Sequence, residues 1–592
     1  MDARRTLLPL VLAVALLAGC SSAGSSGPSP GPDAGPSTVP KARIDLDPER
    51  YVTDYSSDNG TSKGGVNYSM ESDASGAPPP MPMPSPMPPP PPPTIHEDNT
   101  FVDPGEHPFV MAADQPASTF GLDVDTGSFS VGRTFLTEGT LPPPASVRTD
   151  EWVTALGSDQ ADPTDTALGV ATTSAPSALG DTRLVRVGVA ARDLAGEDRL
   201  PAHLTFVVDT SGSMDIRDRL GLVKASLGLL VLNLKDDDTI AIVEYSDDAG
   251  LVLAPTPVSE AQTIVDAIDE LQPSNSTNLE AGLREGYRRA QEAFDPEGVN
   301  AVILASDGVA NQGLTDSDGL AGVIQDRAEG GIHLVTVGYG MGNYNDDLME
   351  QVADRGDGFY AYLDTYEQAE RLFGSQLTST LVVVANDAKA QVTFDPDFVA
   401  EYRLLGYENR SLNTEDFDDE SVDAGEVGAG HRVTAIYEVV LGPPGADLAP
   451  DAVLGKASVR YKAAGSGETV TVTEPIVLGE ATDPADAPAS MRFQAATAAF
   501  AEWLSDQPSA PEVVYDDVVP EGPQQEPMPG PGIGPSAPVD LDRLAAIRAE
   551  AASAAAELGE LPGASVTPQE MLELMDLAAK ATPTPPSYSY GE

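Results

Sequence analysis

The sequence is poor in cysteine, histidine and basic residues, and each shortage excludes a class of protein. One cysteine can form neither an internal disulfide nor a thiolate metal cluster. The five histidines are scattered, so no closely spaced pair is available for zinc. The 592 residues contain 33 Lys and Arg against 93 Asp and Glu, a formal net charge of −60. A nucleic-acid-binding protein needs a basic surface, and so does a protein that docks on anionic lipid through its surface charge; both classes are excluded.

The single cysteine, Cys20, ends an N-terminal segment that has the features of a signal peptide. Arg4 and Arg5 precede an apolar run over residues 7–18, which is shorter than the roughly 20 residues that span a bilayer. The small residues before Cys20 resemble the lipobox of bacterial lipoproteins. The resemblance implies that Cys20 is lipidated and anchors the chain to the cell membrane or outer membrane, facing the periplasm or exterior. The alternatives are a cleaved signal with an incidental cysteine and an uncleaved anchor.

Two segments have a composition that cannot bury a core. Residues 21–98 are rich in Ser, Gly, Pro and Asp and are predicted to be a disordered linker. The proline run at 78–93 predicts a polyproline II spacer, with a ligand for a proline-reading domain as the alternative. Residues 506–538 predict a second linker. The 53 prolines and 55 glycines of the chain agree with long unstructured stretches.

Between the linkers, residues 181–375 alternate apolar strands with amphipathic helices. Strands are predicted at 204–208, 239–245, 301–304 and 332–337, with helices between them. Ser259 and Gln262 predict a capping box at the start of one helix. This rhythm predicts an α/β fold with a doubly wound, mostly parallel sheet covered on both faces. Ligands of such sheets bind at the carboxyl ends of the strands.

Three loops at that edge carry oxygen-bearing side chains. Asp209, Ser211 and Ser213 follow the first strand, Thr277 begins a later helix, and Asp307 follows another strand. Two carboxylates and three hydroxyls suit a small hard divalent cation such as Mg²⁺ or Mn²⁺, with Ca²⁺ as a further possibility. Neutral hydroxyls leave the cation electrophilic, so that a carboxylate from outside can join it.

The pattern Asp-x-Ser-x-Ser, then a distal Thr and a distal Asp, resembles the metal-ion-dependent adhesion site of von Willebrand factor type A domains. The resemblance implies that Ser211, Ser213 and Thr277 are hydroxyl ligands and that Asp209 and Asp307 act directly or through water. Residues 101–156 and 402–439 resemble the flanking segments of the bacterial YfbK-like von Willebrand A lipoproteins. A Rossmann-like domain with smaller α+β or β-rich domains beside it is therefore expected.

The predicted organisation has eight parts. In chain order they are a lipoprotein signal peptide (1–20), a disordered linker (21–98), an N-terminal domain (99–180), a von Willebrand factor type A domain (181–375), a C-terminal domain (376–505), a proline-rich linker (506–538), a helical segment (539–580) and a tail (581–592).

The expected function is a membrane-anchored, extracytoplasmic protein-binding module whose cation captures a partner's Asp or Glu. Specificity would come from the loops 215–219, 246–250, 275–279 and 309–316. A structural envelope scaffold with a merely stabilising cation is the alternative. A metal-assisted hydrolase is disfavoured, because His203 and His333 lie on predicted strands and no nucleophile motif is present. Residues 123–128 begin like a calcium loop, but Thr134 stands where Glu is needed, so a structural turn is preferred.

Overall fold

The computed structural model describes most of the globular part of the chain. The described residues are 44–55, 101, 105, 107–122, 124–194, 199–274, 276–307, 324, 330–340, 346–420, 422, 424–442, 448–507 and 539–583. The signal peptide with Cys20, the proline run and the linker at 508–538 lie outside them. Within these ranges no helix combines the length and the apolar character needed to cross a bilayer.

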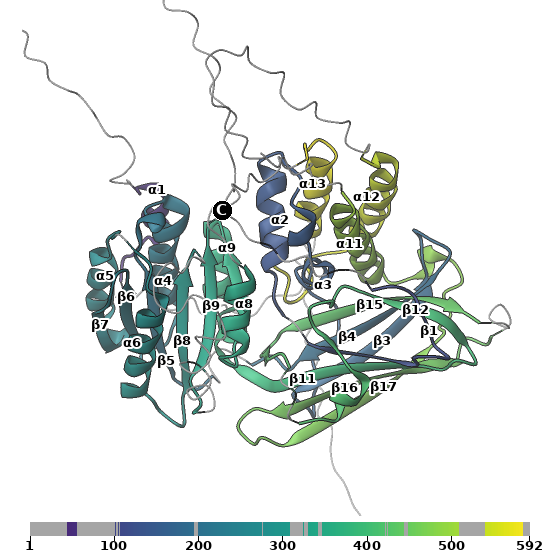
Figure 1. The fold of residues 1–592 in the computed structure, drawn as a ribbon, viewed down its shortest axis with the longest axis horizontal. Coiled ribbons are helices and arrows are strands. Elements are labelled where there is room, and N and C mark those ends of the chain that lie inside the picture. The colour runs from purple at the N-terminus through teal and green to yellow at the C-terminus, as the bar shows by residue number, and fades with distance from the viewer. Residues whose placement is uncertain are drawn as a thin grey trace, which may run out of the picture. The chain divides into compact units, whose positions relative to one another are not determined.

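The α/β domain is built on a six-stranded sheet, and it confirms the predicted fold class (Figure 1). Five strands run parallel, and the edge strand β7 is antiparallel to its neighbour. Their spatial order is β10 (Tyr360–Leu363), β9 (His333–Tyr339), β8 (Val299–Ser306), β5 (Ala202–Asp209), β6 (Thr239–Tyr245) and β7 (Ala249–Pro257).

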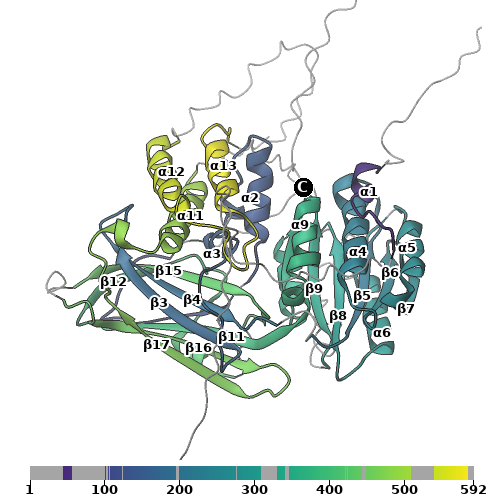
Figure 2. The ribbon, with the colours of Figure 1, turned by 180° about the vertical axis from the view of Figure 1, so that it is seen from behind.

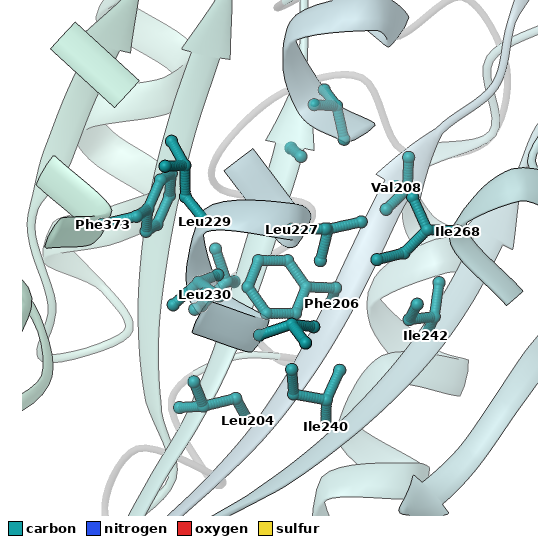
Figure 3. Packing of buried hydrophobic residues seen from close by; sticks show 14 of the residues in the cluster. Leu204, Phe206, Val208, Leu227, Leu229, Leu230, Ile240, Ile242, Ile268 and Phe373 are labelled. Carbon is teal, nitrogen blue, oxygen red and sulfur yellow. The ribbon is translucent and has the colours of Figure 1, made fainter. Parts of the chain in front are cut away.

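Both faces of this sheet are covered by helices because its central strands are apolar on both sides. Leu204, Phe206 and Val208 of β5 pack under α4 (Leu222–Asn233) and α5 (Ala261–Glu270). Figure 3 shows Phe206 beside Leu227 of α4. On the other face the core contains residues of β5 and β8, of α6 (Leu279–Glu292) and of α8 (Asp346–Asp354). Each fully buried large apolar side chain stabilises the fold by about 1.5–3 kcal/mol.

The predicted N- and C-terminal domains do not form separate units; they share one antiparallel β-sandwich (Figure 2). One sheet contains β1 (Val110–Met111), β12 (Val399–Leu405), β15 (Arg432–Leu441), β4 (Arg183–Ala191) and β3 (Leu168–Pro176). The other contains β13 (Ser411–Leu412), β2 (Ala117–Gly121), β11 (Val383–Phe394), β16 (Val453–Ala463) and β17 (Thr469–Val477). The α/β domain is therefore an insertion between two halves of a sandwich, and β4 belongs to the sandwich although the predicted boundary at 181 put it in the α/β domain.

A helical cluster packs together segments from both ends of the chain. It contains α2 (Gly127–Thr137), α3 (Thr149–Thr154), α11 (Ala489–Ser505), α12 (Leu541–Ala555) and α13 (Pro568–Ala578). Its core includes Trp152, Phe500 and Trp503, and the first two rings meet edge to face with centroids 5.5 Å apart. The last two helices lie where the predicted helical segment at 539–580 placed them.

Two local predictions are wrong. Residues 44–55, assigned to a disordered linker, form an ordered strap that includes the single helical turn α1 (Arg50–Thr53) and packs on the α/β domain. Ser259 is not a helix cap, because residues 258–260 already form a 3₁₀ turn that leads directly into α5. The strap is ordered because its few apolar residues pack against the core of the α/β domain, although the composition of residues 21–98 as a whole is typical of a disordered linker.

Candidate metal centre

The two predicted carboxylates come together because β5 and β8 are parallel neighbours. Their register pairs Val208 with Ala305, so Asp209, the last residue of β5, lies beside Ser306. Asp307 follows Ser306 directly. Both Asp209 and Asp307 are completely buried. A doubly wound sheet thus places two acids at the carboxyl edge of its central strands, where such sheets bind ligands.

Asp209 is held by three hydrogen bonds. Its Oδ1 accepts the backbone N–H of Ser211 at 2.8 Å, and its Oδ2 accepts the hydroxyls of Ser306 at 2.9 Å and Tyr245 at 3.2 Å. Burial, and then the negative charge of Asp307, raise the pKa of Asp209 to about 7. Two buried acids of like charge disfavour each other's ionisation, so this pair calls for a positive charge close by.

The predicted hydroxyl ligands lie on two loops beside Asp209. The Oγ atoms of Ser211 and Ser213 are 3.0 Å apart, on a 3₁₀ turn over Gly212–Met214. Thr277 is buried and stands two residues before α6, whose N-cap Asn278 accepts the N–H of Ala281 at 3.1 Å. The loop before Thr277 is tied to the Asp209 loop, since the N–H of Ser274 donates to the carbonyl of Thr210.

Arg219, at the end of the predicted specificity loop 215–219, is buried against Asp307. Its Nη1 donates to Asp307 Oδ2 and to the carbonyl oxygen of Ser213, both at 2.7 Å. It lies in a single π-helical turn, Arg217–Gly221, a form that often occurs at functional sites. Gly340, at a φ of +71°, makes room for it, because a Cβ there would lie 2.6 Å from Arg219 Cγ.

The five predicted ligands, Asp209, Ser211, Ser213, Thr277 and Asp307, are hereafter called the candidate metal centre. Their donor atoms are all oxygens, and the hydrogen-bonded pair of serine hydroxyls and the two buried carboxylates fit a hard divalent cation. No trio of His, Cys, Asp or Glu that could hold a metal converges anywhere in the described ranges, so this centre has only two acidic ligands and depends on hydroxyl oxygens for the rest. The site is therefore compatible with Mg²⁺ or Mn²⁺ by donor chemistry, with Arg219 as an additional positive charge.

Other sequence candidates lie away from this edge. His203 and His333 stand at the start of β5 and β9, at the opposite edge of the sheet, bonded to Thr239 and to the carbonyl of Asp357. In the turn that resembled a calcium loop, Asp125 accepts the N–H of Tyr360 at 3.1 Å, which is a structural role. Asp123, Asn275 and the predicted specificity loop at 309–316 lie outside the described residues.

Comparison with known proteins identifies the family of the α/β domain and of the sandwich. The family model described as "von Willebrand factor type A domain" matches residues 203–375. "Uncharacterized protein YfbK, C-terminal" matches residues 379–527, and "von Willebrand factor" matches residues 95–186. The chain is 38% identical over 423 residues to "Uncharacterized protein YfbK" of Escherichia coli (strain K12), covering 67% of this chain and 73% of that protein.

Two more distant relatives share parts of the chain. An uncharacterized protein of Synechocystis sp. is 25% identical, covering 50% of this chain and 70% of that protein. Inter-alpha-trypsin inhibitor heavy chain H3 of Mesocricetus auratus is 27% identical over 165 residues, covering 26% of this chain and 18% of that protein.

Proposed function

Since the chain belongs to the YfbK-like family of von Willebrand factor type A proteins, we propose that it binds a protein partner through a divalent cation at the candidate metal centre. Domains of this type mediate protein–protein interactions, often with a divalent metal. The finer part of the proposal is that the partner supplies an Asp or Glu carboxylate, and that Cys20 anchors the chain to a membrane on the extracytoplasmic side.

The observation that carries the proposal is the pair of buried acids, Asp209 and Asp307. With both carboxylates ionised, Arg219 leaves one net negative formal charge in a buried site, and a divalent cation that displaces the proton from Asp209 brings this to one net positive charge. A site of that charge favours an anionic oxygen from a partner. When bound, the cation supplies a Lewis-acidic position for that oxygen.

The protein's own residues orient the ligands. The Asp209 carboxylate is fixed by hydrogen bonds from Tyr245, Ser306 and the N–H of Ser211. The Asp307 carboxylate is fixed by a hydrogen bond from Arg219. Because these groups are already hydrogen-bonded, little side-chain entropy is lost when a ligand arrives. The arrangement provides rigid binding; within the described residues the two strand histidines, which could serve as general bases, lie at the other edge of the sheet.

The test is a capture experiment with cell-envelope extract, crosslinking and mass spectrometry. The full chain should retain a partner in Mg²⁺ and lose it in EDTA. Asp209→Ala and the double variant Ser211→Ala/Ser213→Ala should lose the same partner, whereas Glu297→Ala, an exposed acid just before β8 at the opposite edge of the sheet, should keep it. A partner that survives both EDTA and the ligand variants would support the scaffold alternative and overturn the proposal.

A further inference from the structure

The strap, residues 44–55, lies on the helical face of the α/β domain beside the candidate metal centre. Ile44, Leu46, Tyr51, Val52 and Tyr55 pack against the core that contains α4. Figures 1 and 2 both show α1 against α4. Thus an apparently linker-like segment supplies apolar cover for a helix that is buried on nearly every side.

The receiving surface is shaped for the strap by two glycines. A Cβ on Gly221 would lie 2.9 Å from the carbonyl oxygen of Tyr51 and 3.0 Å from the ring of Tyr55. A Cβ on Gly228, two helical turns further along, would lie 3.1 Å from Pro48 Cβ. With a side chain at Gly221 the backbone of the strap would have to shift, and with one at Gly228 Pro48 would have to give way by a few tenths of an ångström. The docking is therefore specific in shape.

Polar contacts fix the strap at two ends of this surface. Near α5, the Tyr51 hydroxyl donates to Asp269 Oδ1 at 2.7 Å, and Arg50 pairs with the same carboxylate at 3.2 Å. At the other end, the Tyr55 hydroxyl donates to Asp215 Oδ1 at 3.0 Å. Asp215 is buried and ends the 3₁₀ turn that carries Ser213. Tyr55 therefore reaches the loop of the candidate metal centre from outside.

The loop between Ser211 and Arg219 is thus held from two sides. Inside, Arg219 donates to the carbonyl of Ser213; outside, Tyr55 donates to Asp215. The backbone between them is tight, with the N–H of Asp215 donating to Gly212 and that of Ile216 to Met214. A shift of the backbone at either end would therefore move the two serine hydroxyls, which lie 3.0 Å apart and are two of the predicted ligands.

We propose that Tyr55 is a positioning residue for the candidate metal centre, and that docking of the strap and binding of a cation favour each other. The inference rests on the proposed function. Coupling between two binding events is reciprocal, so it has two consequences. Loss of the Tyr55 contact lowers cation affinity, and a bound cation makes the strap harder to release.

The first measurement is calorimetric titration of the EDTA-stripped full chain with Mn²⁺. Tyr55→Phe removes only the hydroxyl and should weaken Mn²⁺ binding by about fivefold, as expected for one hydrogen bond to a carboxylate transmitted in part to the site. Gly228→Leu should displace the strap at Pro48, far from the ligands, and weaken Mn²⁺ binding at least as much. Thr53→Ala, whose hydroxyl donates to the Glu49 carbonyl within the strap, is the matched control and should bind as wild type.

The second measurement reads strap docking itself, by trypsin cleavage after Arg50 followed through the N-terminal fragment mass. Mn²⁺ should slow this cleavage in wild type and in Thr53→Ala, but not in Asp209→Ala, and cleavage should be fast with or without Mn²⁺ in Gly228→Leu. Absence of Mn²⁺ binding to wild type would overturn the proposed function together with the coupling. Equal Mn²⁺ affinity in wild type, Tyr55→Phe and Gly228→Leu, with cleavage unaffected by Mn²⁺, would overturn the coupling alone.

Discussion

The surroundings of Asp209 change its pKa, and the change should be measurable as a pH dependence of stability. Its pKa is raised from an ordinary 3.8 to about 7, so without a cation the folded chain keeps a proton there that the unfolded chain loses near pH 4. The folded state then loses stability as the pH rises from about 4 to about 7. A cation competes with this proton, so the increase in melting temperature caused by Mn²⁺ should grow from about pH 5 to about pH 8.

Scanning calorimetry at several pH values checks this, with Asp209→Asn as the variant that carries no titrating group at this position. The variant should show neither the Mn²⁺-dependent increase nor its pH dependence. A Mn²⁺-dependent increase in wild type that is constant over this pH range would contradict the role of Asp209.

Replacing Arg219 should increase the effect of Mn²⁺ on the melting temperature, whereas replacing Asp209 should remove it. Arg219→Gln leaves the buried Asp307 without its cationic partner, which should cost about 3–5 kcal/mol of unfolding free energy in EDTA. Mn²⁺ should restore much of that loss, so the variant's melting temperature should rise more with Mn²⁺ than that of wild type. Arg217→Gln, which removes an exposed pair with Asp218, is the control and should behave as wild type. Equal Mn²⁺ effects in all three proteins would rule out an interaction between Arg219 and the cation.

The sequence predicted the residues of the motif but not the residues that hold them. Asp209 and Asp307 could be placed at one edge because each follows an apolar strand. Arg219 and Tyr245 belong to no spaced motif, and their contact with the acids depends on the π-helical turn and on the pairing of β5 with β6. The positive φ of Gly340, which admits Arg219, is a property of the backbone that the sequence does not specify.

At the scale of the element, α6 positions the site through its glycines. A Cβ on Gly282 would lie 2.7 Å from the ring of Tyr245, and one on Gly286 would lie 2.2 Å from Val207 Cγ2. Both Gly282→Ala and Gly286→Ala should therefore lower unfolding free energy by about 1–3 kcal/mol through overpacking. Only Gly282→Ala displaces the ring that bonds Asp209, so only that variant should also weaken Mn²⁺ binding.

Thermal unfolding and Mn²⁺ titration of the two variants separate these effects, since the same substitution is made one helical turn apart. Equal loss of Mn²⁺ affinity in both would mean that α6 acts through general stability and not through Tyr245.

Helical and strand periodicity predicted most elements of the α/β domain, because its strands are continuous apolar runs and its helices are amphipathic. Periodicity failed where order comes from tertiary contact. The strap has too few apolar residues for a periodic pattern, and those it has pack against a surface that includes Gly221 and Gly228, far along the chain. Ser259 fits a capping pattern, yet the backbone is already helical there.

For the whole molecule, the main surprise is that the β-sandwich joins distant segments. β4 pairs with β15, and β2 pairs with β11, across the inserted α/β domain. Strand pairing over such separations depends on which strands bring their backbone hydrogen-bonding edges together in the folded chain, and this leaves no local signal in the sequence. The two segments therefore looked like separate domains, although each supplies only half of a core.

The same interleaving predicts the effect of a truncation. Ending the chain after residue 507 removes α12 and α13, which contribute Ile547, Met571 and Met575 to the core around Trp503. It also removes the Asp540 carbonyl that accepts the Trp503 indole N–H at 2.8 Å, and Glu550, which pairs with Arg492. Since each large buried apolar side chain stabilises by about 1.5–3 kcal/mol, the truncated chain should unfold at a lower temperature and aggregate.

Ending the chain after residue 583 keeps both helices and is the control. Melting curves and light scattering distinguish the two chains. A chain ending at 507 that melts like the control would show that α12 and α13 add nothing to the stability of the fold.

A divalent cation at the candidate metal centre is central to the proposed function, and its binding can be measured directly. The EDTA-stripped full chain is titrated with Mn²⁺ while the free ion is followed by electron paramagnetic resonance, for wild type and Asp209→Ala side by side. Wild type should bind Mn²⁺ at one site from which excess Mg²⁺ displaces it, and Asp209→Ala should lose that site while keeping its fold. Wild type that leaves all Mn²⁺ free, or a variant that binds as wild type does, would contradict the account.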